Sequence, residues 1–154
     1  MFIPEIPNNS LTNEINHITG LAIALEEIVL FKFCKPASES EIEELENHFN
    51  TILPQSYKDW LSFSNGSVIY DNLVVFFSTS QVKELQINSF PNHYIVIGKV
   101  IGDGEVLCIS KTNQKFIRCF EGEERFYDSL NDFFRRPLKR MLLNAEEIVG
   151  EIDV

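Results

Sequence analysis

Acidic side chains are the most numerous residues in this sequence with a capacity for chemistry. Several of them gather at predicted turns, at Asp71, Asp103, Glu105, Glu121, Glu123 and Glu124. Two carboxylates that flank a pocket can act as general acid and base, but nothing in the sequence places such a pair beside a pocket. Carboxylates at turns are usually solvated, and a ridge of them also suits contact with a basic protein. We therefore predict that these residues are not catalytic.

The three cysteines and three histidines show no spacing typical of a catalytic or metal site. No CxxC motif occurs, and His93 could meet Cys108 or Cys119 only through tertiary contacts. Both of these cysteines lie in apolar runs, where a thiol usually packs as a small hydrophobic group. The sequence also lacks GxSxG, HExxH and Walker motifs. It therefore predicts a protein that is not an enzyme, with no catalytic residue, no metal and no cofactor.

The charge balance disfavours nucleic acid and membranes as direct partners. Lys and Arg number 13 while Asp and Glu number 23, which gives a net charge of −10, whereas a nucleic-acid binder normally carries a basic excess. One cluster of basic residues occurs, at Arg135, Arg136, Lys139 and Arg140. It is best explained as a solvated helix face, with a small phosphate site as the alternative. Unpaired thiols favour a reducing compartment, and no signal peptide or membrane span is recognisable. We predict a cytoplasmic protein.

Three helices are predicted in the first half of the chain. Apolar residues at steps of three and four predict a helix that is capped at Ser10 and continues to Val29. A capping box of Ser38 and Glu41 predicts the start of the second helix. A proline at N1 predicts the start of the third, and the Asn-Gly pair at 65–66 is predicted to end it.

Short apolar runs separated by turn residues predict strands at 68–70, 73–77, 94–97, 105–109 and 115–120. The apolar segment at 29–33 is predicted to form a short strand or a buried tail. Ser80 is predicted to cap a short helix before the strand at 94–97, and Gly122 to end the sheet. The last helix is predicted from residue 128 or 129 to 143, with an interruption at Pro137 and an acidic tail after Asn144.

These elements predict an α+β fold. N-terminal helices pack on a mostly antiparallel sheet of about four to six strands, and a C-terminal helix closes the structure. We expect a single domain over residues 1–154. Within it we expect an arm and first helix at 1–36, a core at 37–136, and a C-terminal helix with an acidic tail at 128–154.

Several segments resemble the SUKH superfamily, which includes yeast cell-wall assembly regulators and many bacterial immunity proteins. The resemblance covers residues 37–136. It begins with an acidic helix at 37–46, a Leu-Pro-x-x-Tyr-x-x-Trp-Leu block at 53–61 and Asn-Gly at 65–66. A strand, a glycine turn, a second strand and a closing helix follow at 94–98, 102–104, 106–109 and 129–134. Residues 67–71 depart from the family's usual glycine-rich or aromatic segment.

The resemblance implies a non-enzymatic α+β domain that binds a protein. Bacterial members are similar to antidotes that neutralise a toxin encoded beside them, often a nuclease or deaminase. A toxin that cleaves nucleic acid carries a basic cleft, which an acidic protein can occupy. We therefore expect an immunity protein that blocks a cognate, basic toxin sterically and electrostatically; a homo-oligomer is compatible with this expectation. Its expected contact residues are those at the acidic turns, Asp71, Asp103, Glu105, Glu121, Glu123 and Glu124. The alternative is a regulatory scaffold that binds signalling or cell-wall proteins.

Overall fold

One antiparallel sheet organises the protein. In the computed structural model the described backbone covers residues 1–101 and 104–152, and the described side chains end at residue 145. The strands lie in chain order, and each pairs antiparallel with the next. They are β1 (Lys32–Phe33), β2 (Ser67–Ile69), β3 (Val74–Phe76), β4 (Tyr94–Val100), β5 (Glu105–Ser110), β6 (Phe116–Phe120) and β7 (Glu123–Tyr127).

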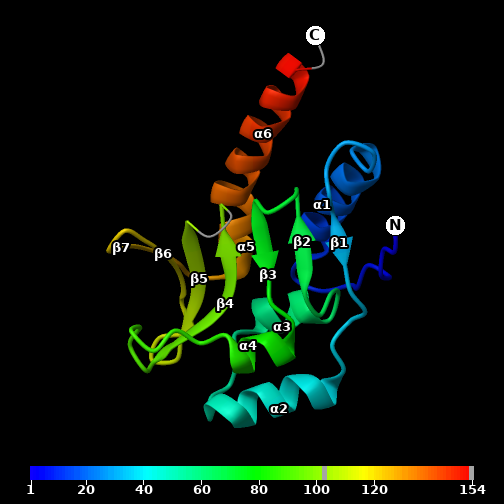
Figure 1. The fold of residues 1–154 in the computed structure, drawn as a ribbon. Helices are drawn as coiled ribbons and strands as arrows, with labels where there is room; N and C mark the ends of the chain where they lie inside the picture. Colours follow the sequence, from blue (N-terminus) through cyan, green and yellow to red (C-terminus); the bar gives the residue numbers. More distant parts are fainter. Residues whose placement is uncertain (102–103, 153–154) are drawn as a thin grey trace.

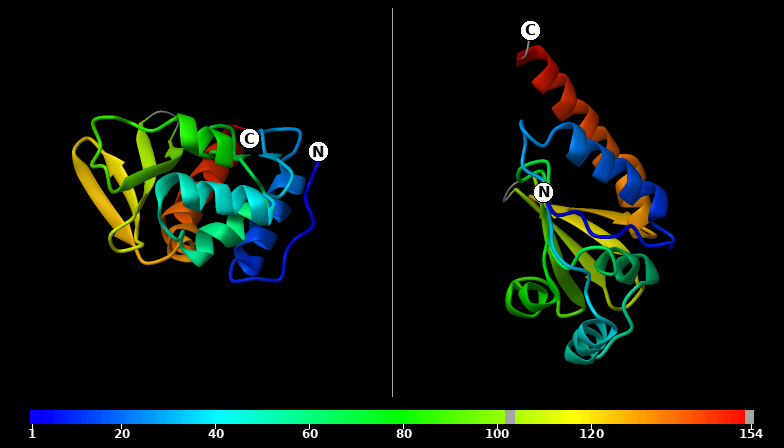
Figure 2. Two further views of the ribbon diagram at one scale, coloured as in Figure 1. Left: turned by 90° about the horizontal axis from the view of Figure 1, so that it is seen from below. Right: turned by 90° about the vertical axis from the view of Figure 1, so that its right-hand side faces the viewer.

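Helices cover one face and one end of this sheet. The first helix and the C-terminal helix run side by side behind the sheet, and the C-terminal helix projects beyond it (Figure 1, Figure 2). At the opposite end lie α2 and α4. This arrangement confirms the predicted α+β fold with a closing C-terminal helix. The helical segments are α1 (Thr12–Ala24), α2 (Glu39–Phe49), α3 (Gln55–Leu61), α4 (Thr79–Glu84), α5 (Leu130–Phe133), the π-helical turn η1 (Phe134–Leu138) and α6 (Lys139–Ile152).

Trp60 of α3 lies at the centre of the core and is fully buried. Its ring centroid is 5.4 Å from that of Phe63, 5.1 Å from that of Phe76 in β3 and 5.1 Å from that of Phe134 in η1. Aromatic pairs at these separations contribute stability beyond the area that they bury. One aromatic cluster therefore joins α3, the sheet and the C-terminal helical segment.

Side-chain caps fix the starts of two helices. Before α2, the hydroxyl of Ser38 accepts a hydrogen bond from the N–H of Glu41 at 3.1 Å, and the Glu41 carboxylate accepts from the N–H of Ser38 at 3.0 Å. This is the predicted capping box, and it satisfies two backbone donors that the helix leaves free. The same pair of hydrogen bonds joins Ser78 and Gln81 before α4. The prediction of Ser80 as the cap of that helix is therefore wrong.

The first helix is shorter than predicted. The hydroxyl of Ser10 donates to the carboxylate of Asp59, and α1 begins without a side-chain cap. The helix ends at Ala24 and not at Val29. Beyond it the chain turns back, and this turn brings β1 onto the sheet, so the apolar residues that continue the helical spacing pack as a buried loop.

The Asn-Gly pair at 65–66 does not end α3, whose C-cap is Ser62. The side-chain oxygen of Asn65 accepts a hydrogen bond from the N–H of Thr79 at 2.8 Å, and its amide donates to Glu41 at 3.1 Å. Asn65 thereby links α2 to the start of α4. The predicted stop was wrong because the pair is used for this tertiary contact.

The predicted hairpins are confirmed, but the sheet has one more strand at its end than the sequence predicts. Glu121 and Gly122 have φ of 48° and 79°, which are values of a type I′ hairpin turn. Gly122 therefore turns the chain into β7 and does not end the sheet. The strand was missed because its residues are mostly charged and exposed, so no apolar run marks it.

The C-terminal helix accommodates Pro137 by a local change of helix type. Pro137 cannot donate a backbone hydrogen bond, and the π-helical turn η1 surrounds it. The helix then continues through α6 to Ile152. The predicted interruption is confirmed, whereas the predicted end at residue 143 is wrong, because the acidic segment after Asn144 continues the helix.

Candidate functional site

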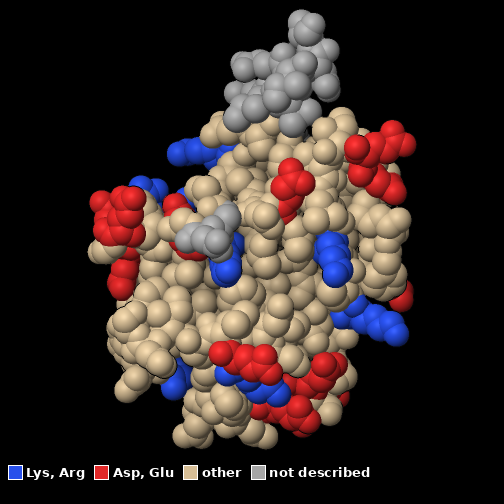
Figure 3. Space-filling view, viewed as in Figure 1, with Lys and Arg blue, Asp and Glu red and all other residues tan. Residues whose placement is uncertain are grey.

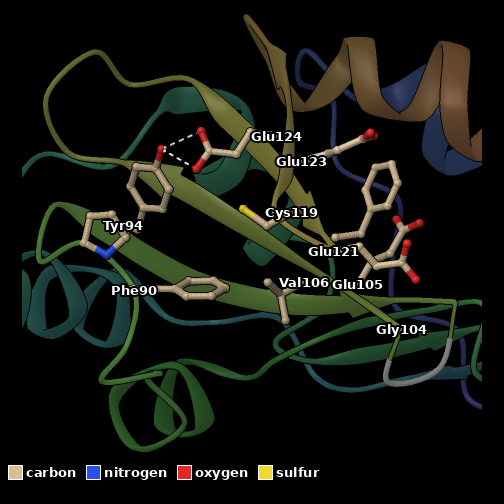
Figure 4. Close-up of a pocket in the computed structure, with 12 residues that line it drawn as sticks. Phe90, Tyr94, Gly104, Glu105, Val106, Cys119, Glu121, Glu123 and Glu124 are labelled. Atoms are coloured by element: carbon tan, nitrogen blue, oxygen red, sulfur yellow. Dashed lines mark hydrogen bonds between the residues drawn. The ribbon is translucent and has the colours of Figure 1, made fainter.

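An open groove lies at the β4–β7 end of the sheet, with an apolar floor and an acidic rim (Figure 4). Its volume is about 280 Å³. The floor is formed by Phe90, Pro91, Tyr94, Val106 and Cys119, and the remaining lining residues form the rim, namely Gly104, Glu105, Phe120, Glu121, Gly122, Glu123 and Glu124. Most binding sites combine apolar surface with a few polar groups that fix orientation, and this groove has that composition.

Strand register places the floor and rim together. Val106 of β5 lies opposite Cys119 of β6, and Cys119 lies opposite Glu124 of β7. Residues that lie opposite each other in neighbouring strands point to the same face of a sheet. The three side chains therefore form one row across the strands, and a shift of one residue in either register would turn part of the row to the other face.

Tyr94 and Glu124 close one side of the groove. The Tyr94 hydroxyl donates to the Glu124 carboxylate and lies 3.0 Å from each of its two oxygens. Desolvation and this hydrogen bond raise the pKa of Tyr94 to about 12. The hydrogen bond fixes the orientation of the Glu124 carboxylate at the rim.

Glu105 forms an ion pair within the protein. The Arg118 guanidinium donates to both of its carboxylate oxygens, one of these bonds being 3.1 Å long, and each side chain is only 11% exposed. Arg118 and Arg125 also lie within 6 Å of the Phe120 ring, at 5.8 and 5.6 Å from its centroid. Glu105 therefore has its charge balanced by a neighbour, unlike the glutamates of the β6–β7 hairpin.

The structure brings four of the predicted residues into one groove, namely Glu105, Glu121, Glu123 and Glu124. Asp71 does not line it. That residue lies in the β2–β3 turn, where its carboxylate accepts from the N–H of Leu30 at 2.8 Å and its own N–H donates to the Leu30 carbonyl at 2.7 Å. Asp71 therefore joins two loops. Asp103 lies outside the described residues.

The floor residues Phe90, Tyr94 and Cys119 were not predicted as site residues. Phe90 belongs to the irregular segment before β4, and Tyr94 and Cys119 belong to strands whose apolar character predicted only burial. The row across β5, β6 and β7 includes β7, which was not predicted from the sequence. No sequence signal marks the row, because Val106 lies in a continuous apolar run with Leu107, Cys108 and Ile109.

Cys108 and Cys119 are hydrogen-bonded to each other on adjacent strands. The hydrogen bond raises the pKa of the buried Cys108 thiol and lowers that of Cys119, which lines the groove. His93 packs edge-on against Tyr94 at a centroid distance of 4.7 Å. Among the residues that the structure describes, no cluster of three or more His, Cys, Asp or Glu side chains has the arrangement of a metal site.

The basic cluster on the last helix is engaged in ion pairs. Arg135 binds Glu14 of α1 at 2.6 Å, and Arg136 binds Asp132 at 3.5 Å. Arg135 and Glu14 line a second groove of about 190 Å³ between α1 and the C-terminal helix. These contacts support the interpretation as a helix face over the alternative of a phosphate site, because two of the four cations already have carboxylate partners.

The fold is a helix-flanked antiparallel meander with an open groove at its β4–β7 end. Residues 36–136 match the family model described as SMI1 / KNR4 family (SUKH-1), and the chain belongs to that family. It is also similar to a protein of Bacillus subtilis (strain 168) described as uncharacterized protein YnaB. The two are 26% identical over 106 residues, which are 69% of this chain and 70% of that protein. In the described part of the chain, no helix has the length and apolarity to cross a membrane.

Proposed function

We propose that this protein is an immunity protein that binds and neutralises a cognate protein toxin, and that the groove at the β4–β7 end of the sheet is its contact site. Membership of the SMI1/KNR4 family (SUKH-1) supports a binding role. The single observation that carries the choice of site is the combination of an apolar floor with unneutralised carboxylates on the rim. In this proposal the protein acts in the cytoplasm and blocks the toxin without enzymatic activity.

In this proposal the charged residues increase the association rate and the apolar residues decrease the dissociation rate. Glu121, Glu123 and Glu124 accelerate the encounter with a basic toxin, because exposed opposite charges steer association and their effect weakens with salt. Tyr94 and Phe90 supply apolar contact area, which slows dissociation when an anchor is fully desolvated. The net charge of −10 has the sign that this steering requires.

A growth assay tests the proposal. A candidate toxic domain is expressed in a heterologous bacterium, with and without the protein. Wild-type protein is expected to restore growth and to bind the purified toxic domain in a 1:1 complex. Growth that is not restored, together with no binding by calorimetry, would overturn the proposed function. Binding of signalling or cell-wall proteins in place of the toxic domain would support the regulatory scaffold.

A matched pair of variants tests the site. The triple change Glu121→Lys, Glu123→Lys and Glu124→Lys alters the net charge from −10 to −4, because each substitution adds two positive charges. The control variant has the same net charge but replaces by Lys three exposed glutamates outside the groove, namely Glu5, Glu27 and Glu43. We expect only the first variant to weaken binding at least about tenfold and to flatten its salt dependence. Equal effects would place the contact elsewhere.

A further inference from the structure

The last strand of the sheet, β7, has an open edge. It pairs with β6 on one side, and in the described part of the chain no strand follows it. Its first four residues are all exposed, and Phe126 is 50% exposed. An edge strand presents unpaired backbone N–H and C=O groups that can pair with an added strand.

The hairpin turn determines which backbone groups face outward. Glu121 and Gly122 form a two-residue type I′ loop, so the flanking pair Phe120 and Glu123 exchanges both backbone hydrogen bonds. Because bonded and non-bonded pairs alternate along an antiparallel ladder, Arg125 is also bonded to β6. The N–H and C=O groups of Glu124 and Phe126 therefore point to the open edge.

The side chains of these two residues lie on the groove face. Glu124 lies opposite Cys119 and Phe126 opposite Ile117 in the register with β6. Cys119 and Glu124 both line the groove. A strand added at this edge would thus place alternate side chains beside the acidic rim, where Glu124 and Phe126 offer one anionic and one apolar contact.

A second copy of this chain is a poor occupant. Antiparallel pairing of two β7 strands through their outward groups sets like charges opposite each other in several registers. One sets Arg125 against Arg125 and another sets Glu124 against Asp128, whereas the register that sets Glu124 against Glu124 also sets Glu123 against Arg125 on both strands. Like charges directly opposite destabilise a strand pair. Acidic side chains also gather at this end of the molecule (Figure 3), so the edge favours a basic strand over a second acidic copy of this chain.

We propose that β7 receives an extended basic segment of the partner as an additional antiparallel strand. This rests on the proposed function and specifies how the groove is used. The segment carries an apolar side chain opposite Phe126 and, two residues later, a Lys or Arg opposite Glu124. Its next basic side chain lies opposite Gly122 and reaches Glu121 at the hairpin turn. Backbone hydrogen bonds supply the pairing, and the alternating side chains supply selectivity.

Amide hydrogen exchange on the intact protein tests the pairing. The probe is the acetylated and amidated hexapeptide Thr-Phe-Thr-Lys-Thr-Lys, at four times its dissociation constant. Four-fifths of the protein is then bound, and exchange at Glu124 and Phe126 is expected to slow about fivefold. The amides of Glu123 and Arg125 already donate to β6 and should change little. Unchanged exchange at Glu124 and Phe126 with bound peptide would overturn the proposal.

Two controls separate strand pairing from charge attraction. The same peptide with alternate backbone nitrogens methylated keeps its charge and loses the donors, so it should bind at least about tenfold more weakly. Equal binding would overturn strand pairing. In the protein, Phe126→Pro removes an outward N–H while Phe126→Ala keeps it. The proline variant should bind more weakly than the alanine variant; equal affinities in two folded variants would count against the proposal.

The growth assay distinguishes the proposed immunity function from the proposed strand addition at β7. If the protein neutralises the toxic domain while the Glu124 and Phe126 amides stay in fast exchange within the complex, strand addition fails and the immunity function stands. If the peptide pairs with β7 but no toxic domain is neutralised, the edge is a basic-strand receptor and the immunity function fails.

Discussion

Replacing Glu105 by Gln tests whether this groove carboxylate serves the fold more than a partner. Arg118 binds both of its oxygens, and both side chains are 11% exposed. Removing one member of a buried ion pair costs about 3–5 kcal/mol, because the other charge stays buried without its partner. Arg118 keeps a hydrogen bond with Tyr127 and its position over Phe120. We therefore expect a loss near the lower limit, about 3 kcal/mol in the free energy of unfolding.

This loss corresponds to a fall in Tm of about 6–12 °C, at about 2–4 °C per kcal/mol for a domain of this size. The assay is urea unfolding followed by the fluorescence of Trp60, the single tryptophan. Glu123→Gln is the matched control, since that carboxylate is exposed, and it should change stability by less than about 0.5 kcal/mol. If Glu105→Gln destabilises no more than this control, the structural interpretation of Glu105 is refuted.

Three further predictions follow from the cysteine pair, a groove phenol and a strand glycine. Absorbance titration should show Tyr94 ionising near pH 12, because its pKa is raised to about 12. The raised pKa contributes to the free energy of unfolding fully below the unfolded pKa of about 10, and this contribution is lost as the pH rises through 12. Tyr94→Phe should abolish that step. Iodoacetamide should modify Cys119 faster than Cys108. The Cys108→Ala variant should slow the modification of Cys119, because the hydrogen bond that lowers the pKa of Cys119 is lost. An unchanged rate at Cys119 would contradict this. Gly98→Ala should destabilise by about 2 kcal/mol or more, because its Cβ would lie 2.4 Å from the Val75 carbonyl oxygen; urea unfolding that matches wild type would contradict it.

Local chemistry made many elements predictable. The capping box of Ser38 and Glu41 depends on residues three positions apart, so the sequence contains both partners. The hairpins around 71–72 and 112–113 likewise depend on adjacent turn residues and flanking apolar runs. The interruption at Pro137 follows from its missing N–H. Where an element's start or break is fixed within a few residues, sequence reasoning placed it.

The errors have a common physical cause. Ser10 was predicted to cap the start of a helix and Asn65 to end one, but the side chain of each contacts a distant residue, Asp59 and Thr79 respectively. β7 lacks an apolar run because one side of it is an open edge in water. A partner that is distant in sequence cannot be recognised from local pattern, and an exposed strand has little apolar signal to detect.

The sequence by itself determined the family, the α+β class, the acidic net charge and the acidic turn that became the groove rim. Only the tertiary structure decided which carboxylates meet. It placed Glu121, Glu123 and Glu124 beside an apolar floor, paired Glu105 with Arg118 and assigned Asp71 to a loop contact. The physical reason is register: side chains alternate between the faces of a strand, so the neighbours of each carboxylate depend on how strands align, which no single strand's sequence specifies.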